Sequence, residues 1–217
     1  MHFWWKLQVL FCRYTQVHRG QCHTPVHVKL RCFFQRQLHH HRMPKNVEIK
    51  AKARNVIRLH QVASELSSSQ DRQILKQEDT FFKCENGRLK LRVIKNKDKL
   101  AELIFYKRAD SAGPKTSEFQ VSHVSAPEEL KLTLGEALGI IGEVRKTRSL
   151  YLVGQTRIHI DEVDGLGDFI ELEVVMEPSQ SFEEGQTIAN TLMDKLGVHK
   201  DDLVTGAYMD LILQKTK

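Results

Sequence analysis

The chain has 217 residues and a formal net charge of +6. Its basicity belongs to residues 1–42, which hold seven Lys or Arg and no acidic residue, whereas residues 43–217 hold 26 basic and 27 acidic side chains. Because the larger part is near neutral, the net charge gives no simple argument for a nucleic-acid partner.

Residues 1–42 also contain three of the four cysteines and seven of the eleven histidines. Single cysteines ten residues apart match no zinc-ligand spacing, and the apolar stretch 3–5 is too short to span a bilayer. The lack of acidic residues is typical of a transit peptide, but the absence of Ser is not. Two interpretations stay open: a dispensable tail on a cytoplasmic protein that begins to fold at Met43, or a mitochondrial presequence. With Cys84 as the only later cysteine, no disulfide framework is expected, which fits a reducing compartment.

The residues from Met43 onward are numerous enough for one domain with a sizeable core, and most of their patterns predict strands. Alternating apolar and polar residues indicate a strand, and apolar residues spaced by three and four indicate a helix. Asn86-Gly87 favours a tight hairpin turn, and Pro127 stands where a helix would begin. Strands are predicted over 46–54, 73–83, 88–95, 101–108, 117–124, 141–153, 155–162, 168–176 and 205–214, and helices over 58–67, from 127, and over 181–195.

Several of these strands carry charged side chains on one face and apolar side chains on the other. Residues 88–93 present three cations, residues 170–174 present two carboxylates, and residues 157–161 present an Arg, a His and an Asp. Residues 46–52 carry Asn, Glu and two Lys on one face. The charges are therefore sorted by strand, with like charges adjacent on the same face.

Two interpretations of these polar faces follow. In the first, the polar faces form a plain solvated surface, since antiparallel sheets commonly have one wet face and exposed charges are well screened. Alternatively, they line a closed antiparallel barrel, where like charges need counter-ions. Carboxylates that need a cation and cations that need a polyanion together suit a complex of Mg²⁺ or Mn²⁺ with a polyphosphate. Alternation alone leaves both interpretations open.

The order of the charged motifs favours the barrel. They lie at 48–50, 87–92, 104–108, 144–148, 159–164 and 166–173. This series resembles the CYTH family of triphosphate tunnel metalloenzymes, which includes class IV adenylyl cyclases, thiamine triphosphatases and inorganic tripolyphosphatases. The resemblance runs from about Asn46 to Lys215, and residues 157–173 are its most specific part. It implies a mainly β (α+β) fold: a closed antiparallel eight-stranded β tunnel with a polar lumen and helices packed outside.

The family's opening motif, Glu-x-Glu-x-Lys, is matched in part. Glu48 and Lys50 align with the second Glu and the Lys, whereas Asn46 stands in place of the first Glu. An Asn oxygen can still ligate a metal but carries no charge, so we expect weaker metal binding there, or the loss of one of two metal sites.

The resemblance also assigns roles to the charged residues. It implies a catalytic set of Glu48, Lys50, Asp161, Glu171 and Glu173, in which all but Lys50 are metal ligands, and a triphosphate-binding set of Lys50, Lys90, Arg92, Arg108, Lys146, Arg148 and Arg157.

Five further residues receive weaker assignments. Lys52 is an additional candidate cation, and His159 is either a phosphate hydrogen-bonding group or a structural residue. Asp79 and Asp164 are expected in turns or hairpins. Glu162 is expected to point to the opposite face of its strand from Asp161.

The implied activity is Mg²⁺- or Mn²⁺-dependent hydrolysis of a terminal phosphoanhydride. No motif for a nucleotide base or ribose is visible, and both Trp residues, which could stack on a thiamine cation, precede Met43. Inorganic tripolyphosphate is therefore the first expected substrate, with thiamine triphosphatase and then adenylyl cyclase as alternatives. Asn46 keeps a non-catalytic triphosphate-binding module open. The expected partner is a small-molecule triphosphate, with no nucleic acid or membrane, and the expected state is a monomer or homodimer.

Overall fold

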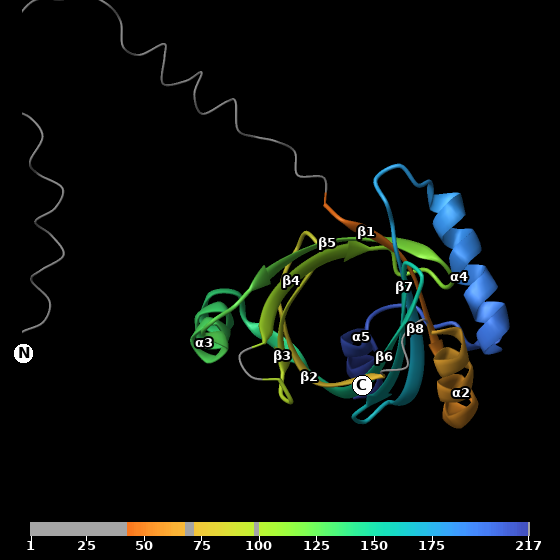
Figure 1. The fold of residues 1–217 in the computed structure, drawn as a ribbon. Coiled ribbons are helices and arrows are strands. Elements are labelled where there is room, and N and C mark those ends of the chain that lie inside the picture. The colour runs from red at the N-terminus through yellow and green to blue at the C-terminus, as the bar shows by residue number, and fades with distance from the viewer. Residues whose placement is uncertain (1–42, 68–71, 98–99, 217) are drawn as a thin grey trace, which may run out of the picture. The chain divides into compact units, whose positions relative to one another are not determined.

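The computed structural model describes residues 43–67, 72–97 and 100–216, and the predictions made for residues 1–42 lie outside that part. Within it, eight antiparallel strands close into a barrel in the order β1-β5-β4-β3-β2-β6-β7-β8, seen as a ring in Figure 1. This confirms the predicted fold class. The strands are β1 (Lys45–Lys52), β2 (Gln73–Phe82), β3 (Arg88–Ile94), β4 (Ala101–Arg108), β5 (Lys115–His123), β6 (Ile140–Val153), β7 (Thr156–Val163) and β8 (Gly167–Val175).

The predicted hairpin between β2 and β3 depends on Gly87. A Cβ atom at this position would lie 2.7 Å from the backbone oxygen of Tyr106 on β4, closer than Cβ atoms come to other groups. Glycine therefore lets the turn close against the neighbouring strand.

Two helices cover the outer face of β1, β7 and β8. They are α2 (Val56–Leu66), whose N-terminus is capped by Asn55, and α4 (Phe182–Leu196), which begins with a capping box formed by Ser181 and Glu184. The apolar residues of β1 that alternate with its charged ones pack against these helices in the main core. Burying one face of the strand in this way turns its charged face toward the lumen.

The helix α3 (Pro127–Leu138) begins at the predicted proline and lies beside β2 and β3, on the opposite side of the ring from α2 and α4 (Figure 1). No helix in the described part of the chain is long and apolar enough to cross a membrane.

The predicted last strand, 205–214, is wrong: the segment forms the helix α5 (Tyr208–Lys215). Gly206 has φ +76°, and the Asp210 carboxylate accepts a hydrogen bond from the Ala207 N–H at 2.7 Å, which starts the helix. A closed barrel of eight strands leaves no edge for a ninth. The apolar side chains of α5 instead cover one end of the lumen, where Tyr208 packs against Phe169.

Candidate functional site: a charged tunnel

The barrel encloses a cavity of about 440 Å³, lined by inward side chains from all eight strands and from the start of α5. Among the described residues, eight basic and five acidic side chains line it. The basic residues are Lys50, Lys90, Arg92, Lys97, Arg108, Lys146, Arg148 and Arg157, and the acidic residues are Glu48, Asp79, Glu102, Glu171 and Glu173.

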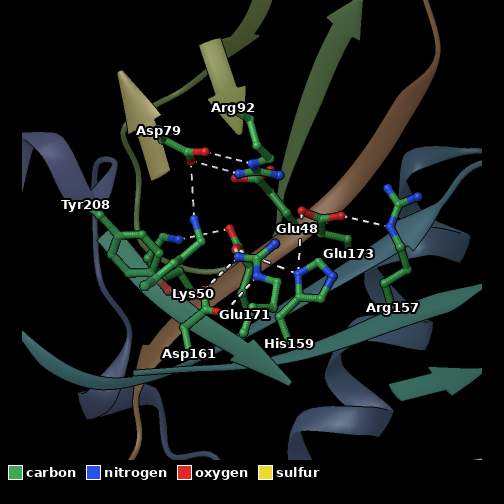
Figure 2. Close-up of polar contacts among 12 residues, drawn as sticks. Glu48, Lys50, Asp79, Arg92, Arg157, His159, Asp161, Glu171, Glu173 and Tyr208 are labelled. Carbon is green, nitrogen blue, oxygen red and sulfur yellow. Dashed lines mark hydrogen bonds and ion pairs between the residues drawn. The ribbon is translucent and has the colours of Figure 1, made fainter. Parts of the chain in front are cut away.

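One part of the lining, which we call the cationic wall, consists of Asp79, Lys90, Arg92 and Lys146 from β2, β3 and β6. The Asp79 carboxylate accepts hydrogen bonds from Arg92 at 2.7 and 2.8 Å, from Lys90 at 2.9 Å and from Lys146 at 3.3 Å. Asp79 is only 1% exposed. Figure 2 shows it above Lys50 and Tyr208, with Arg92 alongside. A single carboxylate therefore serves three cations, of which Lys146 is buried and Lys90 and Arg92 are half-buried.

Burial dominates the ionisation of the wall. Burial lowers the pKa of Lys146 to about 7, and nearby Arg148 and Arg92 contribute although Asp79 opposes the shift. Burial and Arg92 likewise lower the pKa of Lys90 to about 8. Burial alone would raise the pKa of Asp79, but the three cations outweigh it and hold that pKa well below its usual range. An anion bound against the cationic wall would favour the charged forms of Lys90 and Lys146.

Asp79 was expected in a turn or hairpin, and the structure places it in a strand of the β2–β3 hairpin rather than in a turn. It is an inward residue in the middle of β2, paired in register with Arg92. The alternation that puts Gln77, Asp79 and Phe81 on one face of β2 is visible in the sequence, but it does not identify that face as the lumen. Asp164 does lie in the turn between β7 and β8, as predicted, and Glu162 is exposed.

A second part of the lining, which we call the acidic corner, consists of His159, Glu171 and Glu173 from β7 and β8. One ligand atom from each lies within 4.8 Å of the others. The His159 Nδ1 atom is 3.8 Å from an oxygen of each glutamate, and it has no hydrogen-bond partner among the described residues. A buried nitrogen without a partner, beside two carboxylates, fits a divalent metal ion.

The protonation states in the corner also suit metal binding. Burial and Arg148 lower the pKa of His159, so its imidazole is neutral at pH 7 and can ligate. Burial opposes ionisation of both glutamates, but Lys50 and Arg148 hold the pKa of Glu171 well below its usual range. The pKa of Glu173 is lowered as well, by His159 when its imidazole is protonated and by Arg157.

Asp161 lies deeper than the acidic corner and is fully buried. Its carboxylate accepts two hydrogen bonds from Arg148, at 2.7 and 2.6 Å, and one from the Tyr208 hydroxyl at 2.9 Å. Arg148 also donates to Glu171 at 2.6 Å. The structure therefore places Asp161 against Arg148 and Tyr208, and its assignment as a metal ligand stays a prediction.

Glu48, another predicted metal ligand, is paired with Arg108. Burial raises the pKa of Glu48, although Arg108 acts in the opposite direction. The Nε and Nη2 atoms of Arg108 are buried and have no hydrogen-bond partner among the described residues. These unused donors point to an oxygen-rich ligand in the cavity.

Lys50 and Arg157 complete the predicted set. Lys50 donates to Glu171 at 2.9 Å and lies 3.8 Å from the centre of the Tyr208 ring. Arg157 donates to Glu173 at 2.9 Å. Lys52, in contrast, is exposed and is not part of the lining.

Two residues near the site escaped the sequence analysis. Lys115 is 3% exposed, directly opposite Glu48 in the β1–β5 register, and burial together with Arg108 lowers its pKa to about 8. It was missed because strand β5 begins two residues before its predicted start. Tyr208 gave no signal, since its segment was predicted to be a strand.

A closed β tunnel with cations and carboxylates on separate parts of its lining is the architecture that the charged motifs predicted. Residues 44–208 match the family model described as the CYTH domain. The match spans most of the chain, and the protein belongs to the CYTH family.

Solved structures share the fold at low sequence identity. A Pyrococcus horikoshii protein is 24% identical with a TM-score of 0.66, over 76% of this chain and 98% of that one. A Hippeastrum protein, described as an adenylyl cyclase candidate that reveals a dominant triphosphatase activity, is 16% identical with a TM-score of 0.57, over 81% and 97%. No curated protein matches the sequence.

Proposed function

We propose that this protein is a divalent-metal-dependent triphosphatase that hydrolyses the terminal phosphoanhydride of a triphosphate, with inorganic tripolyphosphate as the first substrate. Membership of the CYTH family supports a triphosphate-related activity, and so does the fold shared with the Hippeastrum protein. The observation that carries the proposal is the pair of buried, unused Arg108 donors in a cavity that also contains the acidic corner.

The cationic side chains would bind the polyphosphate chain. Arg92, Arg108 and Arg148 offer planar donor pairs that match phosphate oxygens, and Lys90 and Lys146 act as point charges. In the cationic wall the phosphate oxygens would take over part of the role that Asp79 has toward three cations. The wall would thus fix the position of the ligand by charge and hydrogen bonding.

The acidic corner fits Mg²⁺ or Mn²⁺, held by Glu171, Glu173 and His159, with Glu48 as a further candidate beside Glu173 in the register. A bound divalent ion would supply charge neutralisation and an activated water. Lys50 and Arg148, which both donate to Glu171, would orient that carboxylate and stabilise charge on the reacting phosphate. No protein nucleophile is needed for this chemistry.

The test is phosphate release by the purified full chain from tripolyphosphate, with Mg²⁺, with Mn²⁺ and with a chelator. Metal-dependent release is expected. Arg108→Gln should lower kcat/KM by about 10²-fold, because it removes the unused donors. The matched control is Lys107→Gln, the exposed neighbour on β4, which should retain wild-type kinetics. Tight tripolyphosphate binding with no release in any metal would instead favour a non-catalytic binding module.

An organic triphosphate is a second candidate, and the end of the cavity away from α5 favours it. Leu75 and Leu150 line the cavity there, and Ile94 and Leu100 lie nearby on the β3 side. Leu75 is four residues from Asp79 on β2, about 13 Å along the strand, on the side away from Phe81, which packs with α5. Faster turnover of thiamine triphosphate or ATP than of tripolyphosphate would select this candidate. Cyclic nucleotide release from ATP would indicate a cyclase.

A further inference from the structure

We propose that Arg157 takes the place of a second divalent cation, so that the tunnel works with a single metal ion, held at the acidic corner. The inference rests on the proposed function, since it concerns the metal that would accompany the triphosphate. The sequence predicts from Asn46 that one of two metal sites is weakened or lost, and the structure adds the Arg157 guanidinium that stands in its place.

The geometry around Arg157 is that of a cation held between two side chains. Its Nε atom donates to Glu173 Oε2 at 2.9 Å. The Asn46 amide satisfies both of its groups when its oxygen accepts from Arg157 Nη2 at 3.1 Å and its nitrogen donates to the Lys45 carbonyl at 3.1 Å. Asn46 is only 5% exposed, and Asn46, Arg157 and Glu173 all line the cavity.

Glu173 separates two cation positions. Its Oε2 atom faces the Arg157 guanidinium, whereas its Oε1 atom lies 3.8 Å from His159 Nδ1 in the acidic corner. The fixed cation and the metal site are therefore on opposite oxygens of one carboxylate. A metal ion bound on the Oε2 side would have to displace Arg157.

The charges favour Arg157 over a metal on that side. Hard divalent cations select sites by the number of charged oxygen ligands. Asn46 contributes a neutral oxygen, so Glu173 provides the charge on this side and Arg157 already balances it. The corner differs, because Glu171 and the unpartnered His159 nitrogen remain available there.

The lining as a whole agrees with a single metal. Eight basic side chains against five acidic ones give the described lining a net positive charge. A triphosphate with one divalent ion is still strongly anionic, and the excess of basic groups suits it. With a second ion the ligand would be less anionic, and more of the buried cations would lack a counter-charge.

The experiment counts metal ions directly. The full chain is titrated with Mn²⁺ by calorimetry and by electron paramagnetic resonance, alone and with the slowly hydrolysed imido analogue of tripolyphosphate. We expect one Mn²⁺ per chain for the wild type. We expect a second Mn²⁺ for the double variant Asn46→Glu/Arg157→Gln, which replaces the fixed cation by a second carboxylate beside Glu173. Arg157→Lys keeps a cation in place and should still bind one.

Lys52→Gln is the matched control, because Lys52 is an exposed cation at the end of β1 that does not line the cavity. It should bind one Mn²⁺, as the wild type does. Two Mn²⁺ per wild-type chain would overturn the inference, and so would a folded double variant that still binds one. If the wild type binds one Mn²⁺ but releases no phosphate, the proposed catalysis fails while the metal count stands.

Discussion

The cationic wall and the acidic corner are built from the same kind of strand, yet their chemistry is opposite. In the wall, three cations surround one carboxylate. In the corner, two carboxylates face a neutral imidazole. The difference arises from which strands are neighbours: β2, β3 and β6 bring cations together, while β7 and β8 bring acids together. One lumen therefore carries two chemically different surfaces, which under the proposed function would bind a polyanion and its metal.

The two regions also differ in how their ionisation states respond to pH and to a ligand. In the wall, burial lowers the pKa of Lys146 and Lys90 toward neutrality, so their charge responds to a ligand. In the corner, neighbouring cations keep Glu171 ionised at any pH near neutrality. The charge of the cationic wall can therefore change near neutral pH, whereas the charge of Glu171 in the acidic corner does not. Variants in each region can test this contrast.

The largest effect is expected in the corner, from Glu171→Gln. The amide keeps the shape of the side chain but removes the charge that a divalent ion needs, and we expect metal-dependent phosphate release to fall by about 10³-fold or more. Steady-state assays with tripolyphosphate measure this. Glu162→Gln, on the exposed face of β7, is the control. Turnover that survives Glu171→Gln in a folded protein removes Glu171 from the metal-binding set.

In the wall, Asp79→Asn should act mainly on stability. It leaves three cations, one of them the buried Lys146, without their shared carboxylate, and breaking a buried ion pair costs about 3–5 kcal/mol. Tripolyphosphate should restore more stability to the variant than it adds to the wild type, because it supplies the missing negative charge. Urea unfolding with and without tripolyphosphate measures both effects.

The control for Asp79→Asn is Asp164→Asn, in the exposed turn between β7 and β8. It should leave the free energy of unfolding within about 0.5 kcal/mol of the wild type. Equal stabilisation of wild type and Asp79→Asn by tripolyphosphate would mean that Asp79 does not stand in for the ligand.

These two positions also show what the sequence can and cannot predict. Glu171 was predictable, because period-two alternation assigns it to a polar face and the motif order identifies that face as the lumen. Asp79 carries the same alternation, but a single acid on a strand without neighbouring like charges gives no reason to prefer the lumen. Its role appears only when β3 and β6 are placed beside β2.

The larger error of the sequence prediction was the strand assigned to residues 205–214. Residues 205–214 have the apolar content of a strand, but Gly206 and Asp210 start a helix there, and the closed barrel leaves no edge for a ninth strand. Closure is a property of all eight strands together, so no local pattern could reveal that α5 covers the lumen. Because the segment was predicted to be a strand, the contacts of Tyr208 with Lys50 on β1 and Asp161 on β7 were not predicted.

A smaller effect is expected from pH, and it should separate the wall from the corner. Burial lowers the pKa of Lys146 to about 7, and a bound polyanion would raise that pKa. At a pH between the Lys146 pKa of the free protein and that of the complex, binding takes up a proton. Affinity for tripolyphosphate should therefore fall as pH rises from 7 to 9, by up to about tenfold per pH unit for one proton. Below pH 7 Lys146 is charged in both states and contributes no slope.

The measurement is calorimetry with the imido analogue in two buffers that differ in ionisation enthalpy. Lys146→Gln should reduce the proton uptake, whereas Arg145→Gln, the exposed neighbour on β6, should not. The difference between the two variants cancels the ionisation of the ligand itself. Identical proton uptake by both variants would show that Lys146 does not contribute to the pH dependence, and would leave it to other lysines such as Lys90.

The smallest effect concerns Tyr208, the residue that joins the two regions. Its hydroxyl donates to Asp161 at 2.9 Å, and its ring lies 3.8 Å from Lys50 Nζ and 5.3 Å from Lys146 Nζ. Tyr208→Phe removes the hydrogen bond and keeps the ring, so it should cost about 1 kcal/mol of stability. Because Arg148 still holds Asp161, kcat should change less than about threefold. Tyr208→Leu also removes the ring beneath two lysines, and it should raise the KM for tripolyphosphate while kcat follows the Phe variant. Equal KM values for Phe and Leu would show that α5 only closes the lumen, and that the wall and the corner are organised by the barrel alone.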